Sequence, residues 1–452
     1  MRRSCARPVS RYDRRMKPEL PKKLNVCLIA RQFPIAGRAS GFSFLRLIAR
    51  GLAARGHRVT VLSSNHPSGK QEITQDGVRI FFLMEGRGAR VRRDPFPDLV
   101  KSKFIDLHTS PETGPFHLVH SVDDSAFKIS RHKKSYEVAI AYDVAATRLA
   151  EMFAIMGMAQ ETLGSLLSSG IAVGYRFLRS FYGRDRQLLK SADGVFVTSP
   201  RERLALERYY LYPDARIHTV PYGIEIGDLA SSREKSEELR KTIGVPETAK
   251  VVVTITDMTE VGEVRNLLEA FEQVVIKKPN ARLIVVGDGP KFKEIEYEML
   301  LLALGSKVIF TGAVKESEIP DYIALADVFV NLSARTTGFE PSLLEAMAQK
   351  KVIIGAEGSS MGTIVEHSQD GFLIRPADVS ELSNLLLDIF AGQIPNDLIG
   401  EQARQKVLSL FDPEKMVIET LTAYYAILKA TGRYKLPGTV LNRLSDFLFT
   451  NG

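Results

Sequence analysis

The chain has 452 residues, 44% of them hydrophobic and 25% charged, which is ordinary for a globular protein but too long for one compact core. Cys5 and Cys27 are the only cysteines, which excludes a disulfide framework and a cysteine-based zinc site and favours a reducing compartment. The formal net charge is +8, but residues 1–23 hold nine basic and two acidic residues, so the remaining chain is nearly neutral. No nucleic-acid partner is expected, and two α/β domains are predicted behind a basic tail.

The basic tail, residues 1–23, lacks an apolar stretch of the length that a signal peptide needs, and it contains three prolines. We expect it to be flexible. One interpretation is attraction to an anionic membrane surface, worth about 1 kcal/mol per basic residue held there, and a mobile leader without a role is weighted equally. No other run reaches the roughly 18 to 20 apolar residues of a membrane span. The expected location is the cytoplasm, with peripheral attachment at the inner membrane face as an option.

The first domain begins with a strand, a loop and a helix. Residues 24–30 form an uninterrupted apolar run, typical of a strand in a parallel sheet that is covered on both faces. A loop of small residues at 37–41 is followed by a helical pattern over 42–55 and a strand pattern over 56–62. This order predicts a βαβ unit whose loops lie at the carboxyl ends of the strands. The loop glycines lack the G-x-G-x-x-G spacing, so nicotinamide or flavin binding is weakly indicated.

Further apolar runs complete the expected first sheet, at residues 78–84, 117–120, 138–142, 191–199 and 217–220. The segment after the first of them is a basic loop with an aromatic residue that we expect to be exposed. Its residues are Arg87, Arg90, Arg92, Arg93 and the sequence Asp94-Pro95-Phe96-Pro97. A solvated loop is the favoured interpretation, and contact with an acidic acceptor or a lipid head group is the alternative.

Two polar side chains, His120 and Asp143, stand at the carboxyl ends of predicted strands. Because such ends face the cleft in doubly wound sheets, both are candidates for acceptor binding or proton handling. A lone histidine is often structural, so both interpretations of His120 stay open. Residues 150–189 favour a helix with a methionine-rich apolar surface, which core packing explains better than insertion into a membrane interface.

The second domain repeats the alternation of strands and helices after a polar segment at 227–241. Its expected strands lie at residues 251–256, 281–287, 307–311, 327–331, 351–355 and 371–375. Six strands at these intervals predict a second doubly wound sheet. Two such domains would enclose a cleft between their strand ends, where active sites are most often found.

The segment at 333–348 combines a strand end, a Gly-Phe turn and the start of a helix. Such a junction presents backbone N–H groups and the positive end of a helix dipole to an anion or a hydroxyl-rich ligand. Glu340 lies in the loop and Glu345 in the first turns of the helix. Carboxylates at this place suit the hydroxyl groups of a sugar or a ribose.

The order of these motifs resembles the retaining, nucleotide-sugar-dependent glycosyltransferases of group 1, which have the GT-B fold of two Rossmann-like domains. The resemblance runs from about Leu24 to beyond Arg375. It is carried by residues 56–61, 192–195 with Ser199, 220–224, 285–290 and 338–339 with 343–348.

The resemblance implies four parts: a tail at 1–23, an acceptor domain at 24–226, a nucleotide-sugar domain at 227–412, and helices at 413–452 that return to the first domain. It implies transfer of a hexose-type sugar from a nucleotide-sugar donor to a saccharide or lipid-linked acceptor in surface glycan synthesis, with retention of the anomeric configuration. No metal or other cofactor is expected.

The resemblance also assigns roles to residues. Glu345 would bind the ribose hydroxyls, Arg265 the diphosphate, and the backbone near Gly338 the sugar, while the main chain near Gly312 would border the base. The implied donor set is Gly41, Arg265, Asn266, Gly312, Val314, Thr337, Gly338, Phe339, Glu340, Leu344 and Glu345. No carboxylate is assigned as a nucleophile.

The chain departs from the family pattern at several of these positions. Thr337 stands where the first glutamate is usual, which would weaken one sugar contact by about 1 kcal/mol. Arg265 replaces a lysine whose partner arginine has no match, and Asp143 stands where a second histidine is common. Two hypotheses therefore stay open: an active transferase, which is favoured, and a degenerate relative that binds a glycan or nucleotide sugar without efficient transfer. A hydrolase or an epimerase ranks third.

Overall fold

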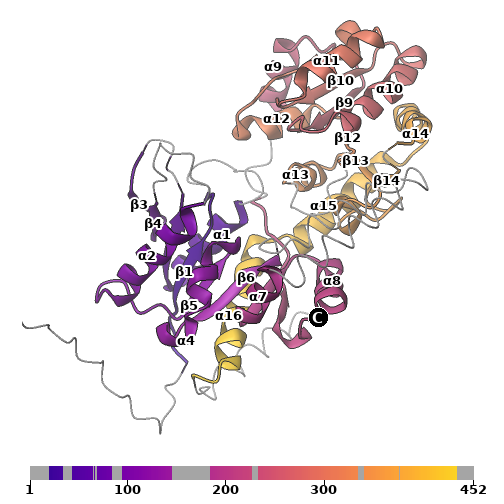
Figure 1. Ribbon diagram of the computed structural model, residues 1–452. Coiled ribbons are helices and arrows are strands. Elements are labelled where there is room, and N and C mark those ends of the chain that lie inside the picture. Colours follow the sequence, from indigo (N-terminus) through magenta and orange to yellow (C-terminus); the bar gives the residue numbers. More distant parts are fainter. Residues whose placement is uncertain are drawn as a thin grey trace, which may run out of the picture.

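The computed structural model describes residues 20–33, 43–64, 66, 69–83, 94–144, 184–225, 233–333, 341–375 and 377–434. Within them the strands form two sheets, one of eight strands in the order β3-β4-β2-β1-β5-β6-β7-β8 and one of six in the order β11-β10-β9-β12-β13-β14. Figure 1 shows two lobes in which helices flank the strands. The predicted α/β architecture of two doubly wound domains is therefore confirmed.

The first sheet is parallel except at one edge, where β3 and β4 pair in an antiparallel hairpin. Its strands are β1 (Asn25–Ile29), β2 (Arg58–Ser63), β3 (Glu72–Gln75), β4 (Val78–Phe82), β5 (Leu118–Ser121), β6 (Ala139–Asp143), β7 (Gly194–Val197) and β8 (Ile217–Thr219). Strand β3 has no counterpart among the predicted strands because its residues are largely polar and exposed. The turn Asp76-Gly77, with both φ angles positive, was the available signal for this hairpin.

The helices of the first domain cover both faces of its sheet. They are α1 (Ser43–Ala54), α2 (Phe96–Thr109), η1 (Asp124–Ala126), α3 (Phe127–Ser130), α4 (Lys133–Tyr136), α7 (Arg184–Ser191), α8 (Pro200–Tyr210) and η3 (Asp214–Arg216). The expectation of an exposed aromatic at Phe96 is wrong, since its side chain is fully buried at the start of α2. Its amide donates to Asp94 Oδ1 at 3.1 Å, and Pro97 is acceptable in the first helical turn. The four arginines of the predicted basic loop lie outside the described residues.

The second sheet is parallel throughout. Its strands are β9 (Val251–Ile255), β10 (Arg282–Val286), β11 (Val308–Phe310), β12 (Val328–Asn331), β13 (Val352–Ala356) and β14 (Phe372–Ile374). Because β9 pairs with β10 on one side and β12 on the other, the strand order reverses between β9 and β12. In sheets of this kind ligands bind outside the carboxyl ends of the strands at such a reversal.

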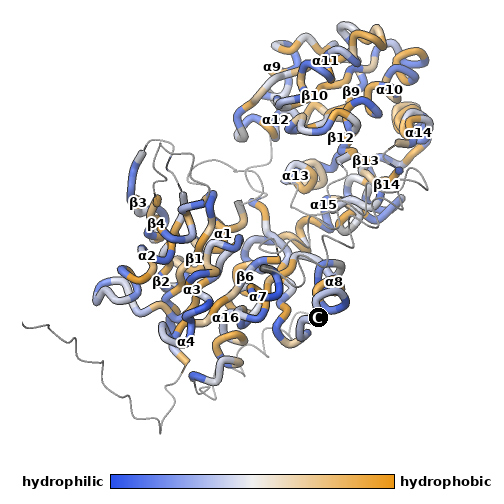
Figure 2. Tube along the Cα trace, viewed as in Figure 1, coloured by the Kyte–Doolittle hydropathy of each residue, from blue (hydrophilic) through white to orange (hydrophobic). Residues whose placement is uncertain are grey.

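Helices surround the second sheet, and several of them bury one apolar face. They are α9 (Arg233–Thr242), α10 (Val261–Lys277), α11 (Phe292–Leu301), η4 (Gly305–Lys307), η5 (Glu316–Glu318), α12 (Ile319–Ala324), α13 (Pro341–Ala348), η6 (Ser360–Thr363), α14 (Val379–Ala391) and α15 (Asn396–Leu410). Figure 2 shows hydrophobic and hydrophilic residues alternating along α10, whose buried residues recur at helical spacing.

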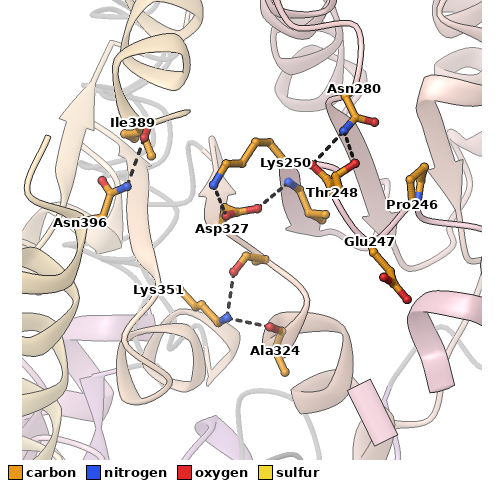
Figure 3. A network of polar contacts seen from close by, with 12 residues as sticks. Pro246, Glu247, Thr248, Lys250, Asn280, Ala324, Asp327, Lys351, Ile389 and Asn396 are labelled. Atoms are coloured by element: carbon orange, nitrogen blue, oxygen red, sulfur yellow. Dashed lines mark hydrogen bonds and ion pairs between the residues drawn. The ribbon is translucent and has the colours of Figure 1, made fainter. Parts of the chain in front are cut away.

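A polar network fixes the amino-terminal edge of the second sheet (Figure 3). Asp327, just before β12, accepts a hydrogen bond from the Val251 amide at 2.8 Å and pairs with Lys250 at 3.1 Å. The Lys351 ammonium donates to two backbone carbonyl oxygens near the end of α12, at 2.7 and 2.8 Å, and its burial lowers its pKa. These contacts hold β9, β12 and β13 in register at the edge opposite the expected ligand.

The last described helix, α16 (Pro413–Ala430), packs in the core of the first domain rather than the second. It lies against α1, where a Cβ at Gly51 would come within 2.5 Å of Val417. A Cβ at Gly223 would come within 2.5 Å of Pro413 Cα, so the two connections between the domains touch there. The chain therefore returns to the first sheet after completing the second.

Candidate functional site

The carboxyl edge of the second sheet is built from backbone loops that need glycine. Gly287, directly after β10, has a φ of +124°, and a Cβ there would lie 1.9 Å from the Thr256 carbonyl oxygen. A Cβ at Gly289 would lie 1.8 Å from the Asp257 carbonyl oxygen. The loop after β10 therefore rests directly on the loop after β9.

The loop after β11 contacts the loop after β10. The Gly287 amide donates to the Gly312 carbonyl oxygen at 3.2 Å, which ties the end of β10 to the segment after β11. Gly312 has a φ of +68°, and both it and Val314 are half-buried. The structure thus places these two predicted donor residues beside the glycine loops, at the same edge of the sheet.

The start of α10 faces this edge as well. Its N-cap residue, Glu260, makes no side-chain hydrogen bond to the first turn, and a Cβ at Gly262 would meet no atom within 4 Å. Asp257, one of the acids expected to disfavour a diphosphate, is occupied locally, since its Oδ1 accepts from the amide and hydroxyl of Thr259 at 3.2 and 2.9 Å. A helix start whose N-cap side chain makes no hydrogen bond to the first turn suits an anion.

Arg265 is the fifth residue of α10, with Asn266 beside it. Its side chain is 45% exposed, and Glu298 on α11 lies 2.7 Å from Nη2. The Arg265 Nε–H also donates to the same Glu298 oxygen, at 2.9 Å. Arg265, the residue predicted to bind the diphosphate, is therefore already in an ion pair. The sequence does not indicate this pair, because Glu298 belongs to none of the recognised motifs.

Helix α13 holds two of the other predicted donor residues, Leu344 and Glu345. Glu345 is its fifth residue, and it is 6% exposed. The Leu344 side chain is fully buried in the hydrophobic core, so only its backbone could meet a ligand. The remaining predicted donor residues lie outside the described part of the chain: Gly41, Thr337, Gly338, Phe339 and Glu340.

In the first domain, His120 and Asp143 lie close together but are enclosed. Each is 2% exposed, and His120 Nε2 is 3.4 Å from Asp143 Oδ2. The Tyr424 hydroxyl of α16 lies 2.7 Å from His120 Nδ1, and the ring of Phe196 stacks on the imidazole at 4.6 Å between centroids. The expectation that His120 faces a cleft therefore fails, because α16 covers its ring.

The surroundings of this cluster are acidic and dry. Burial raises the pKa of the Tyr424 hydroxyl well above its usual range, and the Asp143 charge adds to the shift. Burial and the same carboxylate also raise the pKa of Tyr222. Glu202 accepts from the Thr198 amide and hydroxyl at 2.7 and 2.9 Å, while its burial raises its pKa. The Tyr424 contact joins α16 to β5, and the Glu202 contacts join α8 to the end of β7.

One exposed cation at the carboxyl edge of the first sheet was not predicted. Arg31 follows β1, its guanidinium lies 4.7 Å from the centre of the Phe96 ring, and it pairs with Asp94. Its amide donates to Asp123 Oδ2 at 3.1 Å. The cation–π contact could have been found only if Phe96 had been recognised as a helix start.

Two further properties concern only the described residues. No group of three or more His, Cys, Asp or Glu side chains among them is arranged to hold a metal ion. None of their helices combines the length and apolar character needed to cross a membrane.

Comparison with known proteins gives matches in both domains. Residues 43–223 match the model of the glycosyl transferase 4-like domain, and residues 235–406 match the model of glycosyl transferases group 1. The chain is 29% identical over 192 residues to N-acetyl-alpha-D-glucosaminyl L-malate synthase of Bacillus anthracis, across 42% of this chain and 49% of that protein. It is 27% identical to alpha-monoglucosyldiacylglycerol synthase of Streptococcus pneumoniae, across 42% of this chain and 43% of that one.

These matches span about half or less of the length of each relative. The structure of Anabaena HepE in complex with UDP-glucose is similar over 88% of this chain and 99% of that chain, with a TM-score of 0.65 and 18% identity. At that identity the likeness concerns the fold alone. Because the two family models match one domain each and the fold agrees, the chain belongs to the group 1 glycosyltransferases.

Proposed function

We propose that the protein transfers a hexose-type sugar from a nucleotide-sugar donor to a saccharide or lipid-linked acceptor, with retention of the anomeric configuration. The observation that carries this proposal is the carboxyl edge of the second sheet. There the glycine loops around Gly287, the open start of α10 and Arg265 come together in a domain that matches the group 1 model.

The donor would lie along this edge. Glu345 would accept hydrogen bonds from the ribose hydroxyls, and its low exposure would strengthen them because water competes less. Arg265 and the N–H groups at the start of α10 would meet the diphosphate. The main chain at Gly312, in the segment after β11 that accepts the hydrogen bond of the Gly287 amide, would border the base.

The chemistry requires stabilisation of the leaving group. As the bond from the sugar to the nucleoside diphosphate breaks, negative charge grows on the phosphate oxygens, and fixed cations and N–H dipoles stabilise it without reorganising. In this proposal no metal takes part, and the departing phosphate helps to remove the acceptor proton. His120 and Asp143, being enclosed, act by positioning α16 rather than by touching the sugar.

The proposed acceptor class is broad, because the names of the relatives point to different acceptors. One relative is named as a synthase of N-acetyl-alpha-D-glucosaminyl L-malate, and another as a synthase of alpha-monoglucosyldiacylglycerol. For this chain we propose a saccharide or lipid-linked acceptor in surface glycan synthesis, met in the cytoplasm. The basic tail would supply attraction to an anionic membrane surface.

Calorimetric titration with a panel of nucleotide sugars, combined with release of free nucleoside diphosphate in the presence of membrane extract, tests the proposal. Binding accompanied by release supports an active transferase. Binding without release supports the second candidate, a relative that binds without efficient transfer, which Thr337 in place of a family glutamate favours. Absence of binding for the whole panel contradicts both.

Substitution of Glu345 tests the donor assignment within the same assay. Glu345→Gln keeps the volume of the buried side chain but removes the charge, so binding of the nucleotide sugar should fall about tenfold, the loss expected from charge-assisted hydrogen bonds to hydroxyl groups. The Gln residue should leave the melting temperature nearly unchanged. Unaltered affinity would contradict the ribose assignment.

A further inference from the structure

In the ion pair between Arg265 and Glu298, only one edge of the guanidinium contacts the carboxylate. The Arg265 Nε–H donates to Glu298 Oε1 at 2.9 Å, and Nη2 lies 2.7 Å from the same oxygen. A guanidinium has two edges that can each serve a pair of acceptor atoms, one formed by Nε and Nη2 and one formed by Nη1 and Nη2. Glu298 occupies the first edge and leaves the second.

The Arg265 side chain, whose Nη1/Nη2 edge Glu298 leaves free, projects from α10 near the loop after β9. Arg265 is the fifth residue of α10, and helical side chains lean toward the amino-terminal end of their helix. That end lies at the carboxyl edge of the sheet, beside the loop of residues 256–260. Among the described residues, no other hydrogen bond or ion pair is made by Arg265.

Glu298 is the better anchored member of the pair. Its side chain is 24% exposed against 45% for Arg265. It lies on α11 one turn after Ile295, which is fully buried in the core that α10 and α11 share. A carboxylate on a packed helix can therefore hold a long, flexible side chain in one orientation, while nearly half of the arginine side chain stays exposed.

We propose that Glu298 is a positioning residue that holds Arg265 by its Nε/Nη2 edge and presents the Nη1/Nη2 edge to the diphosphate of the donor. This inference rests on the proposed function. Two phosphate oxygens match the planar pair of N–H groups, a geometry that a lysine ammonium does not offer. The arginine that stands where the family has a lysine thus has its own orienting partner.

The same contact is compatible with two other roles for Glu298, and each predicts a different change in diphosphate binding when Glu298 is replaced. A competitor would keep Arg265 away from the phosphate, so that its removal would tighten binding. A purely structural pair would leave binding unchanged. Because a single oxygen receives both N–H groups, a glutamine can take over the contact through its amide oxygen, whereas an alanine cannot. The pair of variants Glu298→Gln and Glu298→Ala therefore separates geometry from charge.

The experiment measures binding of UDP, GDP and ADP, and of their nucleosides, to the full chain by calorimetry. For the diphosphate that the wild type binds, Glu298→Gln should bind as tightly as the wild type or more tightly. Glu298→Ala should bind about tenfold more weakly, as expected when a bidentate charge-assisted contact loses its geometry. Binding of the nucleoside alone should be the same in all variants.

A matched control lies on the same helix. Glu294 forms an ion pair with Lys291 at 2.7 Å, four residues before Glu298, and Glu294→Ala should leave diphosphate binding unchanged. The melting temperature of each variant, followed by circular dichroism, confirms that it is folded. Arg265→Ala should weaken diphosphate binding at least as much as Glu298→Ala does.

The outcomes separate this inference from the proposed function. Tighter binding by both Glu298 variants would show a competitor and overturn the positioning role. Unchanged binding by Glu298→Ala, with a loss in Arg265→Ala, would also overturn it while leaving the donor site intact. If the wild type binds no nucleoside diphosphate, the proposed function fails together with this inference.

Discussion

Replacement of Gly287 by alanine is expected to be among the most damaging single changes at the carboxyl edge of the second sheet. The residue has a φ of +124°, which side chains with a Cβ rarely adopt, and this strain costs about 1 to 3 kcal/mol. In addition, the new Cβ would lie 1.9 Å from the Thr256 carbonyl oxygen. That atom belongs to the backbone, so no side-chain rotation relieves the clash. We expect a total loss of stability of about 3 kcal/mol or more.

A matched variant separates the clash from the backbone strain. Gly392, which ends α14, also has a positive φ of +72°, but a Cβ there meets no atom within 4 Å. Gly392→Ala should therefore cost only about 1 kcal/mol. Urea unfolding followed by circular dichroism suits a chain without tryptophan. Equal losses for the two variants would show that the loops after β9 and β10 are not in contact.

Two further predictions concern the first domain. Tyr424→Phe leaves the buried His120 Nδ1 without its partner and should lower the free energy of unfolding by about 1 to 3 kcal/mol. Tyr425→Phe should cost less in the same urea titration, because Tyr425 is only half-buried and its hydroxyl donates to the exposed Lys22 carbonyl oxygen. Burial lowers the pKa of His57 and of His117 below 6.5, and each accepts a backbone N–H at Nδ1, so their contribution to stability is complete above about pH 6.5 and is lost as the pH falls toward the lowered values. The melting temperature should drop between pH 7 and 5.5, and replacing both histidines by asparagine should flatten that drop; an unchanged slope would contradict the neutral assignment.

Signals that are local in the sequence predicted their part of the structure correctly. All six strands of the second sheet were recognised from apolar runs, because a strand covered on both faces needs uninterrupted apolar residues. The apolar run of β10 stops at Gly287, and this change correctly marks the end of the strand. At α2 the sequence does carry a local helix signal, although the prolines before it favour a loop. Four apolar residues have helical spacing behind prolines that a first turn tolerates: Phe96, Val100, Phe104 and Leu107.

The environment of His120 could not be predicted, because it depends on a contact across 304 residues. His120 and Leu118 point to the same face of β5, and Leu118 belongs to the hydrophobic cluster that includes residues of α16. No pattern near His120 indicates that a helix after the second domain will return to cover this face. A strand-end histidine can thus satisfy the sequence criterion for a catalytic group and still be a packing residue.

The pairing of Arg265 bears on how the carboxyl edge of the second sheet would attract a diphosphate. Arg265 is paired with Glu298, so the pair carries almost no net charge. Net charge on this pair would therefore add little attraction at long range, and the N–H groups at the start of α10, to which the N-cap side chain of Glu260 makes no hydrogen bond, would add oriented dipoles. Dipoles of this kind act at short range and only in a fixed geometry. The close packing of the loops after β9 and β10, at Gly287 and Gly289, would keep the start of α10 in that geometry.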